Sequence, residues 1–319
     1  MPNIITHYLF ATSVKNKLNN EEVLMAIKEY PQEYTIGSNG PDFLFFYHFF
    51  SKDTNYIKIR KMGNELHRSH INDFYHIALN SYQKERDPDV KQAMLSYLAG
   101  HLCHWALDSV THPYIFYRSG DGVSDAGATH HRFESMMDAM MLKNLLNTDI
   151  RKFPYYSLAR SGLISDRVIS NIYQPVAKQL FNIQCGKEEV RDCLGEWEKL
   201  LKLTYDPKGW KTKVLKVYEK AKKHPYLYSG NIVPIHVDET YDILNNEHRE
   251  WVYPVDPSIK STASFMDLFN QAIDLALDCI NAIDNEEKLM QILDDRSYDK
   301  GIKGDKEMIA FDCIYEDNE

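Results

Sequence analysis

The segment GHLCHWALDSVTHPY contains two histidines and an aspartate at a regular spacing. His104, Asp108 and His112 follow one another at intervals of four residues, so on a helix they share one face. Imidazole and carboxylate groups are ligands that zinc prefers. We therefore expect His104 and Asp108 to converge on one metal ion. Pro113 disfavours helical geometry at the residue before it, so we expect His112 to leave the helix end and reach a second ion.

The segment HHRFESMMDAMM repeats this pattern after a loop that contains glycine and aspartate. His130 and Glu134 are again four residues apart, and two such pairs on two helices predict a multinuclear zinc site. Asp108 stands among Leu, Ala, Cys and Trp residues, where an unpaired carboxylate is costly to bury and a metal would offset that cost. His101 and His131 break the spacing, so we expect them beside the metal ligands or at the surface.

The elements that must position these residues are predicted to be helices. Strand-like alternation is scarce, and breakers cluster at IGSNGPD, YRSGDGVSDAGATH and HPYLYSGNIVPIHV. Apolar residues recur at helical spacing over residues 6–18, 21–30, 63–85, 89–110, 130–146, 166–181, 188–203, 210–223 and 264–283. The sequence therefore predicts an all-α fold.

The chain organisation follows from where this periodicity holds and where it ends. We expect a single helical domain over residues 1–290, with a metal core in residues 1–140 and further helices with an irregular insert in residues 141–290. Residues 291–319 are charged and weakly periodic, so we expect a loosely held tail.

Composition narrows the function class. The formal net charge of −9 argues against a chain whose main role is to coat nucleic acid or an anionic membrane, so we expect no stable nucleic-acid partner. This argument rests on the net charge of the whole chain, and a local site for a phosphate ester remains compatible with it. We identify no secretory signal and no window long and apolar enough for a transmembrane segment. The five cysteines are widely spread and form no CxxC motif. A cytoplasmic location with reduced thiols is the expectation.

The same residues carry a resemblance to a known family. In order along the chain, the pattern consists of His7, the GPD that ends at Asp42, the H-x3-D-x3-H of His104, Asp108 and His112, and the H-x3-E of His130 and Glu134. This pattern resembles the bacterial zinc-dependent phospholipase C family, and the framework is similar to that of the fungal zinc nucleases. The resemblance implies a multi-helix bundle with a trinuclear zinc cluster at the bottom of a cleft.

The resemblance also implies which residues bind the metals. His104 and Asp42 would bind one zinc, and Asp108 would bridge it to another zinc that His7 also holds. The remaining zinc would be held by three further residues, His112, His130 and Glu134.

Two ligands are less directly given by the resemblance. The family needs one more histidine after Asp42, for which we choose His67, with His48 and His70 as alternatives. The mature N-terminal residue is also a ligand in the secreted relatives, and Pro2 would take this place if Met1 is removed. If Met1 stays, this metal site is incomplete, and a two-zinc enzyme or a weakened third site is expected.

These expectations lead to a function. We expect a zinc-dependent phosphodiesterase of the phospholipase C type that uses a metal-activated water, with Asp42 orienting or deprotonating that water. Its substrate would be a phosphate ester, either a phospholipid head group or a nucleotide. The alternatives are a nuclease or nucleotidase-type phosphoesterase, and a non-catalytic helical protein with a structural metal cluster. The chain has no His-Asp dipeptide, H-E-x-x-H or G-x-S-x-G, so the hydrolases that need those motifs are excluded.

Overall fold

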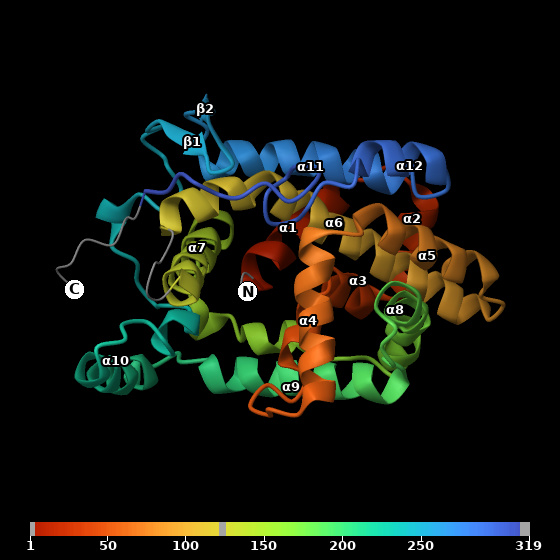
Figure 1. Ribbon diagram of the computed structural model, residues 1–319, viewed down its shortest axis with the longest axis horizontal. Helices are drawn as coiled ribbons and strands as arrows, with labels where there is room; N and C mark the ends of the chain where they lie inside the picture. Colours follow the sequence, from red (N-terminus) through yellow and green to blue (C-terminus); the bar gives the residue numbers. More distant parts are fainter. Residues whose placement is uncertain (1–3, 121–125, 313–319) are drawn as a thin grey trace.

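The computed structural model describes residues 4–120 and 126–312, and these residues form a helical body (Figure 1). The α-helices are α1 (Ile4–Lys17), α2 (Glu21–Glu29), α3 (Pro31–Gly37), α4 (Thr54–Arg68), α5 (Ile71–Lys84), α6 (Pro88–Ser119), α7 (Ala126–Leu146), α8 (Ser165–Phe181), α9 (Lys187–Thr204), α10 (Trp210–Lys222), α11 (Phe265–Asn281) and α12 (Glu286–Leu293). Short 3-10 helices are η1 (Asp42–Phe46), η2 (Ile150–Lys152), η3 (Tyr155–Ala159), η4 (Ser229–Asn231) and η5 (Glu239–Tyr241). The predicted all-α fold is confirmed.

A small antiparallel hairpin is the only sheet among the described residues. It pairs β1 (Trp251–Tyr253) with β2 (Asp256–Ser261) and lies inside the stretch for which the sequence predicts an irregular insert. Trp251 is buried and its ring lies 5.5 Å from that of Tyr114 on α6. The hairpin therefore packs onto the helical body as a local cover.

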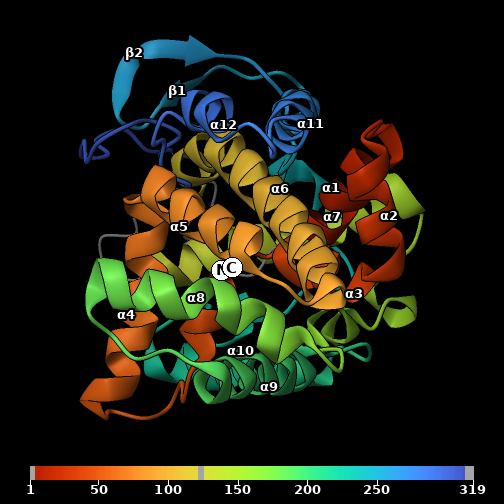
Figure 2. The same cartoon turned by 90° about the vertical axis from the view of Figure 1, so that its right-hand side faces the viewer.

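Helix α6 is the central element of the fold. It lies between α11 and α12 on one side of the molecule and α9 on the other, as Figures 1 and 2 show. Asp87 caps its first turn by accepting hydrogen bonds from the backbone N–H groups of Asp89 and Val90, and Pro88 fits the first helical position because no hydrogen bond is lost there. Most of its 32 residues are buried, so His104 and His112, the first and last residues of the H-x3-D-x3-H motif, both lie in the interior.

The expectation that α6 ends before Pro113 is wrong. The helix continues to Ser119, so His112 keeps helical geometry and stays on the same face as His104 and Asp108. A proline in a helix leaves the carbonyl four residues earlier without its usual donor, and that carbonyl belongs to Ser109. Gly301 packs directly over this point, since a Cβ there would lie 2.1 Å from the Ser109 oxygen. Tertiary packing thus covers the weak turn.

The helix predicted over residues 63–85 is two helices in the structure. Helix α4 ends at Arg68 and α5 begins at Ile71, and His70 between them has a left-handed backbone with φ 62°. Such a conformation interrupts a helix for any L-residue. The break turns α5 away from α4 and leaves His67 in the last turn of α4.

The beginning of the predicted tail packs against the body. Leu293, Ser297 and Tyr298 are each at most 2% exposed, and Trp105 of α6 donates its indole N–H to the carbonyl of Arg296. The division at residue 290 stays a prediction about domain organisation, but Leu293, Ser297 and Tyr298 are part of the buried interior.

Among the described residues, no helix is both long and apolar enough to cross a membrane. The four described cysteines, Cys103, Cys185, Cys193 and Cys279, are buried free thiols.

Candidate metal centre

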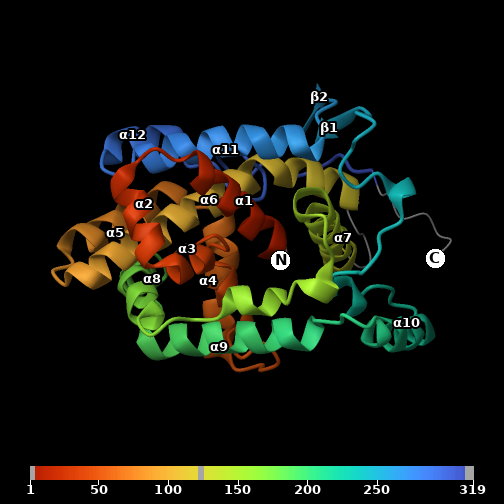
Figure 3. The ribbon, with the colours of Figure 1, turned by 180° about the vertical axis from the view of Figure 1, so that it is seen from behind.

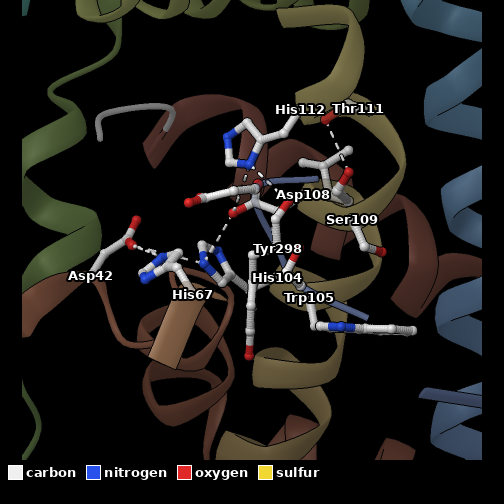
Figure 4. A network of polar contacts seen from close by, with 12 residues as sticks. Asp42, His67, His104, Trp105, Asp108, Ser109, Thr111, His112 and Tyr298 are labelled. Atoms are coloured by element: carbon white, nitrogen blue, oxygen red, sulfur yellow. Dashed lines mark hydrogen bonds and ion pairs between the residues drawn. The ribbon is translucent and has the colours of Figure 1, made fainter. Parts of the chain in front are cut away.

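Helix α6 presents a row of three buried polar side chains to the interior (Figure 4). His104, Asp108 and His112 are 1%, 3% and 8% exposed. One carboxylate oxygen of Asp108, Oδ2, lies 3.2 Å from His104 Nε2 and 3.7 Å from His112 Nδ1. The local spacing of four residues is sufficient to produce this row, because it places the three side chains one turn apart.

Helix α1 brings His7 against this row. His7 Nε2 lies 3.2 Å from Asp108 Oδ1, which is the carboxylate oxygen that His104 does not face. The His7 and His104 rings have centroids 4.3 Å apart. Asp108 therefore faces imidazoles with both of its oxygens, as a carboxylate that bridges two metal ions would.

A second group forms where α4 and η1 meet α6. His67 Nε2 lies 2.9 Å from Asp42 Oδ1, and His104 Nε2 lies 3.8 Å from the same oxygen. His67 Nδ1 lies 2.7 Å from the carbonyl of Gly63 and must donate to it, so in the neutral ring Nε2 carries the lone pair. A lone pair facing a carboxylate oxygen needs a cation or a proton between them.

The third group lies between α6 and α7. His130 Nε2 and His112 Nε2 lie 3.1 Å and 3.5 Å from Glu134 Oε1. His112 Nδ1 lies 3.1 Å from the carbonyl of Tyr298 and donates to it, which again leaves Nε2 as the free ligand atom. The Phe116 ring stacks on that of His130 with centroids 4.5 Å apart and fixes its plane.

A tight turn delivers Asp42 to the site. Gly40 has a left-handed backbone with φ 51°, and a Cβ at this position would lie 2.1 Å from the His104 ring. Only glycine fits both conditions at once. The glycine in the GPD motif therefore lets the η1 turn lie directly on His104.

The electrostatics of these groups are those of a site suited to cations. Burial alone would raise the pKa of the Asp108 carboxyl, but His112, His104 and His7 hold this pKa well below its usual range. Burial lowers the pKa of His112, yet Asp108 and Glu134 outweigh this effect and raise the pKa to about 10. Burial also depresses the pKa of His104. A cation held by Glu134 and His112 would therefore compete with a proton on His112.

The donor set fits zinc. Each of three groups brings its ligand atoms within 4.8 Å of one another, and all are histidine nitrogens or carboxylate oxygens. The groups are His7, His104 and Asp108; Asp42, His67 and His104; and His112, His130 and Glu134. Within the part of the chain that the structure describes, the buried His104 Nε2 has no hydrogen-bond partner. Its nearest polar neighbours are carboxylate oxygens of Asp108 at 3.2 Å and Asp42 at 3.8 Å, so a metal ion held between these groups would satisfy it.

A cavity of about 300 Å³ opens onto this centre. Its lining combines the metal-group residues, except His104, with a few others: Phe45, Asn64, Arg68, Phe116, Gly127, His131 and Asp299. Of the aromatic residues near the motif, Phe116 lies at this cavity, whereas Tyr114 is buried and donates its hydroxyl to the carbonyl of Ile243. A cavity of this volume has room for a small phosphate ester next to the metal groups.

The other histidines considered from the sequence lie outside the three metal groups. His48 stacks on Tyr56, and His70 pairs with Asp73 on the outside of α5. His101 is buried next to the hydroxyls of Tyr75 and Tyr173 and lies outside the three metal groups. His131 lines the cavity, with Nδ1 3.8 Å from Glu134 Oε2. Pro2 lies outside the described residues.

Two neighbouring residues at the site were missed by sequence reasoning. The Tyr298 ring lies 5.1 Å from that of His67 and 5.3 Å from that of His104, and the Tyr298 backbone N–H donates to the carbonyl of His67. Asp299 lines the cavity beside Arg68, with which it forms an ion pair at 3.4 Å. No local sequence signal marks these residues, because they reach the site only through the fold, which places the segment after α12 next to the end of α4.

Asp138 was also missed, although a signal for it exists. It extends the α7 spacing to H-x3-E-x3-D, which mirrors the α6 pattern. Asp138 Oδ1 accepts hydrogen bonds from the backbone N–H of Thr6 at 2.8 Å and from its hydroxyl at 2.6 Å. Burial raises the pKa of Asp138 to about 7. Asp138 is therefore a positioning residue that ties α7 to the first turn of α1, next to His7.

Replacing Asp138 with alanine is expected to destabilise the protein by about 2–3 kcal/mol, because two buried donors of Thr6 lose their acceptor. We also expect weaker zinc binding, because His7 follows Thr6 directly. Thermal unfolding and zinc titration measure the two effects. Asp138→Asn is the milder comparison, since its carbonyl can still accept from Thr6 while its amide loses only the bond from the backbone N–H of Ile5 to Oδ2 at 3.3 Å, so a smaller loss is expected. Equal losses in both variants would contradict this role.

Comparison with known proteins gives one match. A family model described as zinc-dependent phospholipase C matches residues 6–187, which is more than half of the chain. No curated protein and no solved structure matches. The matched range contains the eight residues of the three metal groups, whereas Tyr298, Asp299 and α10 lie beyond it.

Proposed function

Because the chain belongs to the zinc-dependent phospholipase C family, we propose that its metal centre hydrolyses phosphodiesters. Membership of this family supports a hydrolase that acts on a phosphate ester and depends on zinc. The finer proposal concerns the number of ions, their ligands and the substrate.

The observation that carries the proposal is the position of Asp108. Its two carboxylate oxygens lie 3.2 Å from His7 on one side and 3.2 Å from His104 on the other. We propose that Asp108 bridges two zinc ions, one shared with His7 and one with the group that contains Asp42, His67 and His104. His112, His130 and Glu134 would hold a further ion, and Pro2 would complete the ligand set if it is the mature N-terminus. Two or three ions are therefore expected.

Bound zinc would polarise the phosphoryl oxygens and lower the pKa of a water ligand toward neutrality. Asp42 is 5% exposed and lines the cavity, where its carboxylate would orient this water and accept its proton. Arg68 stands at the cavity with its guanidinium held by Asp299, in a position to bind a phosphate oxygen of the substrate. Both roles are part of the proposal.

A phospholipid head group is the preferred substrate and a nucleotide phosphodiester the alternative. Phe45 and Phe116 give the cavity apolar surface, and each stacks on an imidazole of the metal groups, His67 and His130. The chain carries a net charge of −9, which disfavours long nucleic acids as substrates.

Metal analysis combined with hydrolysis tests the proposal. Protein purified without chelator is expected to contain two or three zinc ions per chain and to hydrolyse bis-p-nitrophenyl phosphate. Removal of zinc with a chelator should abolish hydrolysis, and added zinc should restore it. A full complement of zinc without hydrolysis of any phosphodiester would instead identify a structural cluster. Folded protein that binds no zinc would overturn both the catalytic and the structural role.

A further inference from the structure

Helix α10 exposes large apolar side chains in a row. Trp210, Val214, Val217 and Tyr218 are 58%, 60%, 72% and 49% exposed. At 3.6 residues per turn, positions i, i+4, i+7 and i+8 lie on one stripe of a helix. Such a stripe normally faces a protein core, and its exposure on α10 is typical of an interaction surface.

The opposite face of α10 is held to the body by a buried carboxylate. Glu219 is 2% exposed and accepts hydrogen bonds from the backbone N–H groups of Tyr228 and Ser229 and from the Ser229 hydroxyl. At the other end of the helix, Asp206 accepts from the N–H and the hydroxyl of Thr212. These contacts fix the rotation of α10, so its apolar stripe is a defined outer surface.

Lysines surround this stripe. Residues 208–223 contain seven lysines and a single acidic residue, the buried Glu219, in a chain whose net charge is −9. Lys213 and Lys220 are exposed and lie along one edge of the stripe, and Lys222 lies along the other edge. Figures 1 and 3 show α10 at one end of the molecule, away from α8 and α12. A local basic and apolar patch thus stands on an acidic protein.

We propose that α10 docks the protein on an anionic phospholipid surface. An apolar stripe that contains a tryptophan, flanked by lysines, is the pattern of a helix that lies in the membrane interface. The lysine stems extend along the apolar stripe while their ammonium groups reach the anionic head groups. The acidic remainder of the chain is repelled by such a surface, so docking is confined to the α10 end.

A second copy of the chain is the main competing occupant, because its acidic surface would also attract the lysines. The two valines at the middle of the stripe favour the bilayer, since an acidic surface offers them no apolar partner. The inference goes beyond the proposed function, because docking on a bilayer requires no hydrolysis.

The fluorescence of Trp210 can report this contact without an added label. Of its four tryptophans, Trp105, Trp197 and Trp251 are at most 2% exposed, so only Trp210 can pass from water into lipid. With vesicles of phosphatidylcholine mixed with phosphatidylglycerol, we expect a blue shift of the emission and co-flotation of the protein. Vesicles of phosphatidylcholine alone should give a much weaker response, and added salt should weaken binding to the mixed vesicles.

Variants separate the lysines and the apolar stripe from the overall charge. Lys213→Glu with Lys220→Glu should lower partitioning into the mixed vesicles about tenfold or more. Lys178→Glu with Lys288→Glu, at exposed sites on α8 and α12, makes the same change in net charge and should leave partitioning near that of the wild type. Val214→Ser with Val217→Ser should also reduce partitioning, because it removes apolar area from the stripe. All positions are exposed, so the fold should be retained.

The inference would be overturned if the α10 lysine variant and the control lysine variant lost vesicle partitioning equally. It would also be overturned if the α10 lysine variant bound vesicles as well as the wild type. Sedimentation that shows a dimer dispersed by the α10 pair, without vesicle binding, would assign the stripe to a second copy. Hydrolysis of bis-p-nitrophenyl phosphate by the wild type is scored separately. Vesicle binding without hydrolysis would count against the proposed function alone, and hydrolysis without vesicle binding would count against the docking surface alone.

Discussion

Asp108→Ala is expected to remove most of the bound zinc and to lower the hydrolysis of bis-p-nitrophenyl phosphate at least about 100-fold. Asp108 is the residue whose two oxygens face His7 and His104, so in the proposed arrangement its loss removes a ligand from two zinc ions at once. It also provides the carboxylate that faces His112. Elemental analysis and steady-state kinetics on the same preparation measure the two effects together.

The control for this change is Asp274→Ala, which removes an aspartate from an exposed position in helix α11. Zinc content and kcat/KM of this variant should match those of the wild type. Circular dichroism should show the helical content retained in both variants. If Asp108→Ala keeps its zinc and its activity, the carboxylate does not bridge metal ions, and the proposed ligand assignment fails.

Gly40→Ala is expected to destabilise the protein by about 2–4 kcal/mol and to weaken zinc binding. A left-handed φ of 51° costs a residue with a Cβ about 1–2 kcal/mol. The new methyl group would also lie 2.1 Å from the His104 ring, so either this imidazole or the turn that carries Asp42 must shift. Thermal unfolding with and without zinc measures the stability, and competition with a chromogenic chelator measures the affinity.

Gly195→Ala is the matched control for Gly40→Ala. Gly195 lies inside α9 and has no positive φ, and a methyl group added to it would meet no other side chain or neighbouring element within 4 Å. An alanine there should stabilise the helix by up to about 1 kcal/mol. Opposite signs in the two variants are the expected result. A Gly40→Ala protein with wild-type stability and zinc affinity would show that the turn does not hold His104 in place.

The part of the site that the sequence predicts best is the part that depends on local spacing. His104 with Asp108 and His130 with Glu134 are each four residues apart, and any helix through them brings each pair together. The same reasoning made the helical fold predictable, since apolar periodicity reflects which face of a helix is buried. The same four-residue spacing continues from Glu134 to Asp138, so the sequence also places Asp138 on this face of α7.

Local rules fail where packing compensates for a local cost. Pro113 should end a helix by its own chemistry, yet α6 continues to Ser119 with Tyr114 and Ile115 buried in the core, so packing outweighs the lost hydrogen bond. His70 breaks a segment whose apolar periodicity looks continuous, because its backbone is left-handed. In both cases the free energy that decides the local conformation comes from contacts with other parts of the chain.

The sequence by itself therefore determined the all-α fold class, most of the helices and the histidine–carboxylate pairs on α6 and α7, because these depend on residue type and on intervals of one or two helical turns. Only the tertiary structure decided that His67 rather than His48 or His70 meets Asp42, and that Tyr298 returns to donate to His67 and accept from His112. It also turned the apolar stripe of α10 outward. These features depend on contacts between distant residues, and no spacing along the chain encodes such contacts.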